Sequence, residues 1–321
     1  MPLARDGGIA HWILTTKSNN DDGSRPILSS CESLRKRAVY CKAGSDVVVE
    51  GWAHGIGSVF TEEGFRGRGY ASRMMRELAG RLRGQGLFSV LYSDIGKTFY
   101  ARHGWAPFES CHVAFRPVVG GVGEGAGGLA RPIGYHELAE LCAVDERLLR
   151  ADLVRRAKGG RTCVALLPEL DALLWHLMRE DYMTKCIFGK TPSVRGAVAG
   201  EPGKRVWAVW IRGYYGGLKK EEGNTLHILR VVVEDPEQPA DELVDGFRSI
   251  LQMAQAEAAE WRTQDVQVWN PTPKIRGLID KCGIGYEFID RDKESIASLM
   301  WYGEEPTAEL DWVANEKYAW C

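Results

Sequence analysis

Three features are scarce in this sequence of 321 residues: net charge, long apolar runs and clustered metal ligands. Lys and Arg total 41 against 43 Asp and Glu, and no basic stripe stands out. This balance argues against a nucleic-acid partner. No apolar run approaches the ~20 residues of a membrane span, and residues 1–20 are too polar for a signal peptide. We therefore expect a cytoplasmic protein without a membrane partner.

The eight cysteines are scattered along the chain, with no C-x-x-C pair and no cluster with histidine. This spacing argues against a disulfide framework and against a zinc site, and it is typical of reduced thiols in an intracellular protein. We therefore predict no bound metal. The length allows two domains with a sizeable core.

The most informative motif is Arg66-Gly67-Arg68-Gly69-Tyr70-Ala71. It follows an apolar segment that predicts a strand over 56–60, and it opens a segment that predicts a helix over 71–83. Alternate glycines let the backbone turn tightly, so that loop and helix-start N–H groups point into one concavity. With the two arginines, this predicts an anion site suited to a pyrophosphate. A surface turn with solvated arginines is the alternative.

The segments after this loop continue an α/β pattern. The predicted helix places apolar residues on one face, and a buried strand is predicted over 88–92. A short helix over 97–102 and a strand over 111–116 follow. The apolar face of the first helix carries Ala71, Met74, Met75, Leu78 and Leu82.

Two motifs in this order resemble the GNAT acetyltransferases. The spacing R-x-x-G-x-A of residues 66–71 is similar to the GNAT loop that holds the pyrophosphate of acetyl-coenzyme A. Residues 93–105 resemble the GNAT pattern N-x-x-A-x-x-L-Y-x-x-x-G-F, with Tyr100 at the tyrosine position and Ser93 in place of Asn. The resemblance covers residues 10–117 and implies a GNAT fold with a mixed central sheet.

A closer resemblance runs along nearly the whole chain. The segments HGIGSVFTEEGFRGRGYASRMM, FSVLYSDIGKTFYARHGW, RVWAVWIRGYYG and WVANEKYAWC are similar to the fungal L-lysine N6-acetyltransferase-like family. The resemblance implies acetyl-CoA as donor and a free amine, lysine in the best-known members, as acceptor. It also implies a first strand and one or two helices ahead of residues 11–14, forming part of the amine-binding wall. We expect these elements to be missing here.

Without that front piece, residues 11–15 are predicted to form an edge strand. We expect a segment from 199–321 to cover this edge. The expected result is a monomer whose two halves share one cleft, with the acceptor entering between them.

The rest of the chain divides into three further parts. Residues 119–130 predict a glycine-rich linker after a first domain over 1–118. Residues 131–198 read mostly helical, and 199–321 predict a second, degenerate GNAT-like α/β unit, with generic α/β alternation as the alternative. One helical stripe expected to face the core is Leu173, Leu174, Leu177, Met178 and Tyr182.

The second unit is expected to lack a CoA site. Its strand-to-helix junction over 234–242 contains no glycine, two prolines and five acidic residues. Prolines remove N–H donors, and the acidic side chains repel a pyrophosphate.

Acetyl transfer to an amine needs a neutral nucleophile, a polarised thioester carbonyl and a proton for the leaving thiolate. An amine of pKa ~10.4 is neutral in only about one molecule in two to three thousand at pH 7, so a base must collect its proton. His54 is a candidate base, although a lone strand histidine is commonly structural. Glu50 and Asp94 are alternatives, and Asp94 could instead attract a cationic acceptor or cap a helix.

The resemblance implies that Tyr100 donates the proton to the thiolate, with a packed structural tyrosine as the alternative. A backbone N–H of residues 59–61 is expected to polarise the carbonyl, and the other amides to pair with pantetheine. The predicted catalytic residues are Tyr100, His54 and Asp94. The predicted cofactor-binding residues are Val59, Phe60, Thr61, Arg66, Gly67, Arg68, Gly69, Tyr70, Ala71 and Ser93.

The resemblance, together with these features, implies an acetyl-CoA-dependent N-acetyltransferase acting on a small-molecule amine, with free L-lysine at N6 or a related amine as the first candidate. The alternative is a truncated, catalytically weak or inactive GNAT relative that serves as a CoA-binding or interaction module.

Overall fold

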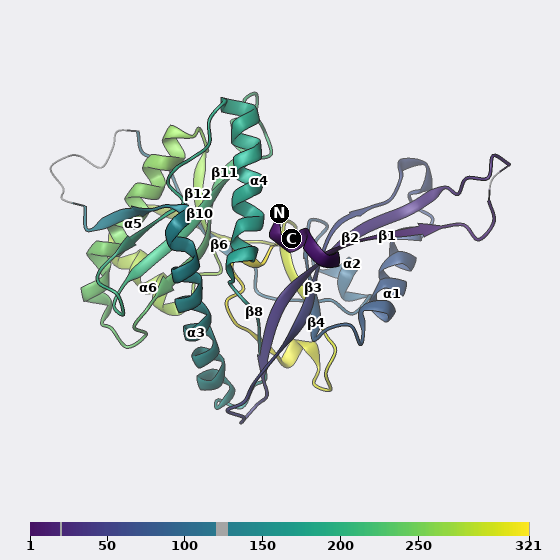
Figure 1. Cartoon of the computed structure of the whole chain (residues 1–321), viewed down its shortest axis with the longest axis horizontal. Coiled ribbons are helices and arrows are strands. Elements are labelled where there is room, and N and C mark those ends of the chain that lie inside the picture. Colours follow the sequence, from purple (N-terminus) through teal and green to yellow (C-terminus); the bar gives the residue numbers. More distant parts are fainter. Residues whose placement is uncertain (20, 120–127, 321) are drawn as a thin grey trace.

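The computed structural model describes residues 1–19, 21–119 and 128–320, and it contains two mixed β-sheets (Figure 1). The first sheet has the order β15 (Asp311–Trp312), β8 (Cys163–Leu166), β2 (Ile27–Cys41), β3 (Val48–Phe60), β4 (Phe88–Ser93), β14 (Ile296–Trp301) and β5 (Ala106–Pro107), with β1 (Ile9–Thr15) also paired to β2. The second has the order β13 (Tyr286–Asp290), β6 (Cys111–Phe115), β12 (Asp265–Trp269), β11 (Asn224–Val233), β10 (Val206–Tyr214), β9 (Gly196–Ala199) and β7 (Ala130–Ile133).

Six α-helices accompany these sheets in the described residues, which confirms the predicted α/β class with a mixed sheet. They are α1 (Tyr70–Leu82), α2 (Thr98–Ala101), α3 (Leu138–Ala157), α4 (Leu170–Phe188), α5 (Ala240–Glu260) and α6 (Pro273–Cys282). The short 3₁₀ segments are η1 (Pro2–Gly7), η2 (Glu63–Phe65), η3 (Tyr135–Glu137), η4 (Glu221–Gly223), η5 (Thr307–Glu309) and η6 (Lys317–Ala319). Most of the predicted linker, residues 120–127, lies outside the described residues.

The sheets are joined by a shared apolar core. This core takes side chains from one face of each sheet and from α3 and α4, which lie in the middle of Figure 1. Helix α1 packs on the other face of the first sheet through Met74, Met75, Leu78 and Leu82, as predicted. Helices α5 and α6 cover the outer face of the second sheet.

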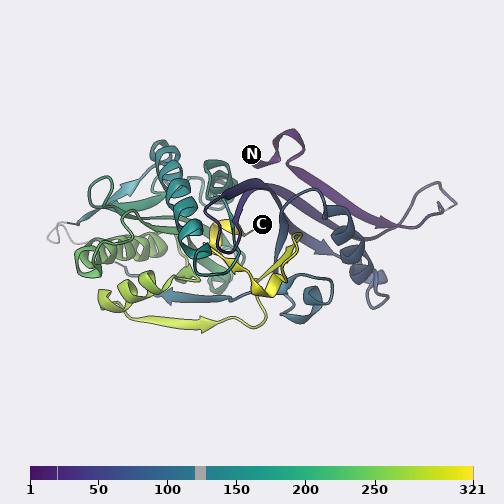
Figure 2. The same cartoon turned by 90° about the horizontal axis from the view of Figure 1, so that it is seen from below.

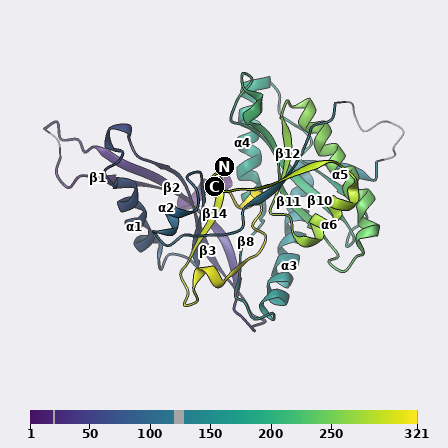
Figure 3. The ribbon, with the colours of Figure 1, turned by 180° about the vertical axis from the view of Figure 1, so that it is seen from behind.

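The two sheets exchange strands. β6 was expected in the first core, but it pairs with β12 and β13 in the second sheet. Figure 2 shows the blue β6 in the left half of the molecule, beside the yellow-green β13. In return β14, from near the end of the chain, pairs with β4 in the first sheet, and Figure 3 shows it in yellow. Each sheet therefore depends on chain from the other half.

The expected cover for the first edge strand is not found. β1 pairs along β2, and none of the described residues between 199 and 320 pairs with β1. The second half enters the first sheet elsewhere, with β14 beside β4 and β15 beside β8. The hairpin of β1 and β2 extends away from the body at the right of Figure 1.

Helix α4 buries only part of the predicted stripe: Leu173 and Leu177 are buried as predicted, and the rest of the buried face differs. Met178 and Tyr182 are 39% and 69% exposed, whereas the buried face includes His176, Glu180 and Thr184. These polar side chains can be buried because each has a partner. His176 Nε2 donates to the Tyr318 carbonyl at 3.0 Å, and Thr184 Oγ1 donates to the Glu180 carbonyl at 2.8 Å. No helix among the described residues is long and apolar enough to cross a membrane.

His176 predicts a loss of stability in acid. Burial, with the nearby charge of Lys36, lowers the pKa of His176 to about 3, against ~6.5 for an unfolded histidine. The unfolded chain therefore takes up a proton first, and the stability that this histidine provides above pH 6.5 is lost as the pH falls toward 3. For this one group we expect a loss of ~2 kcal/mol at pH 5.

The measurement is guanidinium unfolding of the wild type and of His176→Asn at pH 7 and pH 5. The wild-type midpoint should fall on acidification, and the variant should fall less. An equal fall in both proteins would show that His176 is not the source.

Candidate active site

Strand β3 carries a β-bulge near its end. Two of its residues, Ser58 and Val59, lie opposite the single residue Cys31 of β2. Ser58 has a φ of 52°, a conformation that a serine adopts only under constraint. Its hydroxyl donates to Glu32 Oε1 at 2.6 Å, which helps to hold it there. A bulge bends a strand and changes its direction.

Beyond this bulge, β3 separates from its neighbour β4. The parallel pairing extends from the Ala53–Phe88 pair to the Ile56–Leu91 pair and ends there, although both strands continue. The last residues of β3, 57–60, therefore present an edge that β4 does not fill. The predicted Val59, Phe60 and Thr61 lie at this end, where a ligand with amide groups can pair with the free edge. The glycines at 55 and 57 are a feature of the sequence from which this bulge could have been predicted.

The glycine loop follows directly and leads into α1. Gly67 and Gly69 have φ angles of 75° and 77°, and Gly69 caps the helix. The N–H groups of residues 67–72 donate to no other group in the described chain. A Cβ atom at either glycine would meet nothing within 4 Å, so the space in front of the loop is open. Free amides at the positive end of a helix dipole make an anion site.

Two arginines stand beside these amides without a carboxylate partner in the described chain. The Arg66 guanidinium lies 5.6 Å from the centre of the Phe60 ring, and its Nε donates to the Thr61 carbonyl at 3.1 Å. The Arg68 guanidinium lies 5.9 Å from the centre of the Phe65 ring. Both side chains therefore add positive charge next to the helix start.

Tyr100 lies in one apolar cluster with side chains of α1, the bulge and the first sheet. Its ring is 8% exposed and packs in a cluster with Met75 and Leu91, to which Val59 also contributes. Burial, with the nearby Asp94, raises the pKa of Tyr100 to about 12. The hydroxyl has no partner among the described residues and is not sealed from solvent. Tyr100 is therefore a protonated donor at neutral pH that opens to the solvent side of the cluster.

The candidate bases lie in different places. His54 Nε2 is 3.4 Å from the carbonyl of Gln85, in the loop that precedes β4, and this is the end of the sheet opposite the bulge. Glu50 lies farther back on β3 and forms ion pairs with Arg37 and Arg150. The structure does not bring either residue to the separated end of β3.

Asp94 and Ser93 lie at the end of β4, close to Tyr100. Asp94 Oδ1 accepts from the backbone N–H of Ser295 at 3.0 Å, in the turn that leads into β14. Ser93 Oγ donates to the Gly96 carbonyl at 2.7 Å and accepts from the Ile95 N–H at 3.2 Å. The Ser93 hydroxyl thus shapes a turn, and its role in cofactor binding stays a prediction.

The second unit repeats this strand geometry, but the corresponding backbone groups already have hydrogen-bond partners. Pairing of β11 with β12 ends at Ile228, and farther along β11 the N–H of Val231 donates to Glu316 Oε2 at 3.0 Å. In the loop before α5, Lys274 Nζ donates to the carbonyls of Pro236 and Gln238 at 2.5 and 2.9 Å. Carbonyl groups face inward here, whereas the loop at 66–71 offers amides. This contrast supports the prediction of a single CoA site.

Within residues 1–19, 21–119 and 128–320, no group of three or more His, Cys, Asp or Glu side chains is arranged to hold a metal ion.

The chain is similar to two proteins of known sequence. A lysine acetyltransferase of Yarrowia lipolytica (strain CLIB 122 / E 150) is 25% identical over 358 residues, covering 94% of this chain and 86% of the relative. The uncharacterized protein YGR111W of Saccharomyces cerevisiae (strain ATCC 204508 / S288c) is 32% identical over 119 residues, covering 33% of this chain and 29% of that protein.

Similar solved structures include a probable N-acyltransferase from Enterococcus faecalis V583, with 15% identity and a TM-score of 0.48 over 86% of this chain and 59% of that one. A GCN5-related N-acetyltransferase from Kribbella flavida has 14% identity and a TM-score of 0.46 over 85% of this chain and 56% of that one. The chain thus spans less than two thirds of these solved proteins.

Two family models match complementary parts of the chain. The acetyltransferase (GNAT) family matches residues 38–105, which contain the bulge, the glycine loop and Tyr100. The LYC1 GNAT-like C-terminal domain matches residues 121–321, which is more than half of the chain. The chain therefore belongs to the GNAT superfamily of acetyltransferases, with a C-terminal domain of the LYC1 GNAT-like family.

Proposed function

We propose that this protein is an acetyl-CoA-dependent N-acetyltransferase that acts on the amine of a small molecule, with free L-lysine at N6 as the first candidate. The observation that carries the proposal is the meeting of three features: the unpaired amides of residues 67–72, the separated end of β3 and the Tyr100 hydroxyl. The resemblance to a relative named lysine acetyltransferase supports lysine as the acceptor.

The residues of the first unit hold the donor in this proposal. The amides of 67–72, with Arg66 and Arg68, bind the pyrophosphate, and the free edge of residues 57–61 pairs with the pantetheine arm. Acetyl-CoA supplies an acetyl group activated as a thioester. The Val59 N–H donates to the carbonyl oxygen of this thioester and stabilises the negative charge that develops there.

Tyr100 and Asp94 handle the protons. As the amine forms the new C–N bond and the C–S bond breaks, Tyr100 donates its proton to the departing sulfur. Asp94 is the candidate carboxylate near Tyr100, and its Oδ2 has no partner among the described residues. It attracts the acceptor ammonium and takes up the proton that the amine must lose before attack.

The test measures turnover of acetyl-CoA with a panel of amines, and release of the free thiol serves as the readout. The panel contains L-lysine, a polyamine and an amino sugar. We expect turnover with lysine and acetylation at N6 by mass spectrometry. Absence of thiol release with every amine would overturn the proposal in favour of a non-catalytic CoA-binding module.

A further inference from the structure

A second site lies in the C-terminal half, outside the residues assigned to acetyl transfer. A cavity of about 40 Å³ is bounded by α4, the ends of β10 and β11, and η6 with Trp320. None of its lining residues belongs to β3, the glycine loop or α2. A water molecule needs roughly 10–15 Å³ of such space, so the cavity can hold about three or four waters or one small polar group.

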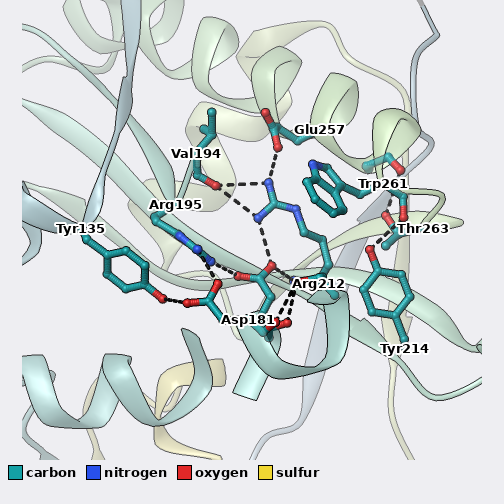
Figure 4. A network of polar contacts seen from close by, with 12 residues as sticks. Tyr135, Asp181, Val194, Arg195, Arg212, Tyr214, Glu257, Trp261 and Thr263 are labelled. Atoms are coloured by element: carbon teal, nitrogen blue, oxygen red, sulfur yellow. Dashed lines mark hydrogen bonds and ion pairs between the residues drawn. The ribbon is translucent and has the colours of Figure 1, made fainter. Parts of the chain in front are cut away.

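One wall of the cavity is fixed by a buried ion-pair network, part of which is shown in Figure 4. Glu180 accepts from Arg195 Nη1 at 2.7 Å through one oxygen and from Arg212 Nη1 at 2.9 Å through the other. Arg212 also donates to the Val194 carbonyl and to Glu257, as Figure 4 shows. Glu180 is the one carboxylate among the lining residues, and both of its oxygens are already used.

Three cationic side chains line the cavity: Arg179, Arg212 and Lys317. The charge of Arg212 is balanced by Glu180 and Glu257. Arg179 is exposed at the mouth, 5.7 and 5.9 Å from the ring centres of Tyr215 and Trp320, and forms no ion pair in the described chain. These aromatic contacts orient its planar guanidinium, whose fork of N–H groups suits an oxyanion.

His227 gives an independent indication of a ligand. It lines the cavity at 7% exposure, and neither ring nitrogen has a hydrogen-bond partner among the described residues. Burial and the neighbouring cations hold its pKa well below the usual value, so the imidazole is neutral. A buried polar group without a partner is costly, and an oxygen atom placed in the cavity would accept its N–H.

We propose that this cavity binds the carboxylate of a small molecule. The cationic Arg179, which forms no ion pair in the described chain, calls for an anion, and the volume fits a single carboxylate. The Arg179 guanidinium can present two parallel donors to the carboxylate oxygens. Tyr215 and Trp320 provide apolar surfaces for the rest of the ligand. The carboxylate belongs either to the acceptor amino acid, a case that rests on the proposed function, or to a separate small acid.

The first experiment measures binding by calorimetry in the absence of acetyl-CoA. L-lysine, acetate, inorganic phosphate and 1,5-diaminopentane, which is lysine without its carboxylate, are titrated into the full chain and into three variants. Arg179→Gln should weaken binding of the carboxylates about tenfold, in keeping with loss of a charged hydrogen bond, and Arg179→Lys should restore part of it. Arg147→Gln, at an exposed arginine of α3 without an ion pair in the described chain, should bind as the wild type does.

Three results would overturn the proposal: no binding of either carboxylate, equal binding by Arg179→Gln and wild type, or binding of phosphate without binding of the carboxylates. Because acetyl-CoA is absent, these results do not depend on whether the protein has acetyltransferase activity.

Turnover then separates the two sources of the carboxylate. If it belongs to the acceptor, Arg179→Gln raises KM for lysine about tenfold and leaves KM for 1,5-diaminopentane unchanged. If it belongs to a separate acid, KM for lysine is unchanged, and added acetate alters turnover of the diamine in the wild type only. Carboxylate binding without thiol release from any amine would show that the site exists and that the proposed acetyl transfer fails.

Discussion

Replacing Tyr100 with phenylalanine is expected to lower kcat by roughly 10²-fold or more while leaving acetyl-CoA affinity nearly unchanged. The substitution removes one hydroxyl and keeps the ring that packs against Met75 and Leu91. Because burial raises the pKa of Tyr100 to about 12, the wild-type hydroxyl stays protonated through the physiological range and remains ready to donate. Without this donor, the thiolate must leave as an anion.

The measurement is steady-state thiol release together with calorimetric binding of acetyl-CoA. Tyr182→Phe is the matched control, since Tyr182 is 69% exposed on α4 and loses the same single hydroxyl. A normal kcat in Tyr100→Phe would remove Tyr100 from the mechanism. A large loss of acetyl-CoA affinity would instead indicate a structural role for its hydroxyl.

Local sequence was sufficient for the donor side of the site. The predicted helix over 71–83 is observed as α1, and the glycines at 67 and 69 have the left-handed conformation that the tight turn requires. The apolar face of α5 was also predictable, because the helical period of 3.6 residues places Leu243, Phe247 and Ile250 on one side. Such features are determined by neighbours in sequence.

Features that depend on distant partners were not predictable in this way. β6 and β14 both read as buried strands, and nothing in either segment specifies which sheet it will join. On α4, hydropathy predicted that Met178 and Tyr182 would face the core. The structure buries Glu180 and His176 instead, because their hydrogen-bond partners come from β10 and the C-terminal tail, which are distant in sequence. Strand exchange and buried polar networks are properties of the assembled fold.

The candidate base illustrates the same limit. His54 has a suitable pKa in isolation and lies on the strand whose end separates from β4. Only the register of β3 against β4 shows that His54 lies beside Ser89 and the Gln85 carbonyl, at the end away from the bulge. A β-strand rises about 3.3 Å per residue, so a shift of a few residues along the strand decides whether a side chain reaches a site.

Substitution of Gly69 by aspartate is expected to raise the Kd for acetyl-CoA by roughly 100-fold or more, which corresponds to about 2.8 kcal/mol. The new carboxylate would stand in the concavity of the free amides, where a pyrophosphate would bind, and would repel it. Aspartate is a favourable helix cap and tolerates positive φ better than most residues, so α1 itself should persist. The loss should therefore come from charge and occupied space rather than from unfolding.

Two controls isolate the effect of charge at this position. Gly69→Asn places a side chain of the same shape there without the charge and should weaken binding much less than Gly69→Asp. Gly80→Asp adds the same charge on the exposed side of α1, where a Cβ atom meets nothing within 4 Å, and should bind normally.

Calorimetry on the wild type should give one acetyl-CoA per chain, because Glu316 already accepts from the Val231 amide in the second unit. Two binding sites, or normal affinity in Gly69→Asp, would place the pyrophosphate elsewhere and refute the role of the 66–71 loop.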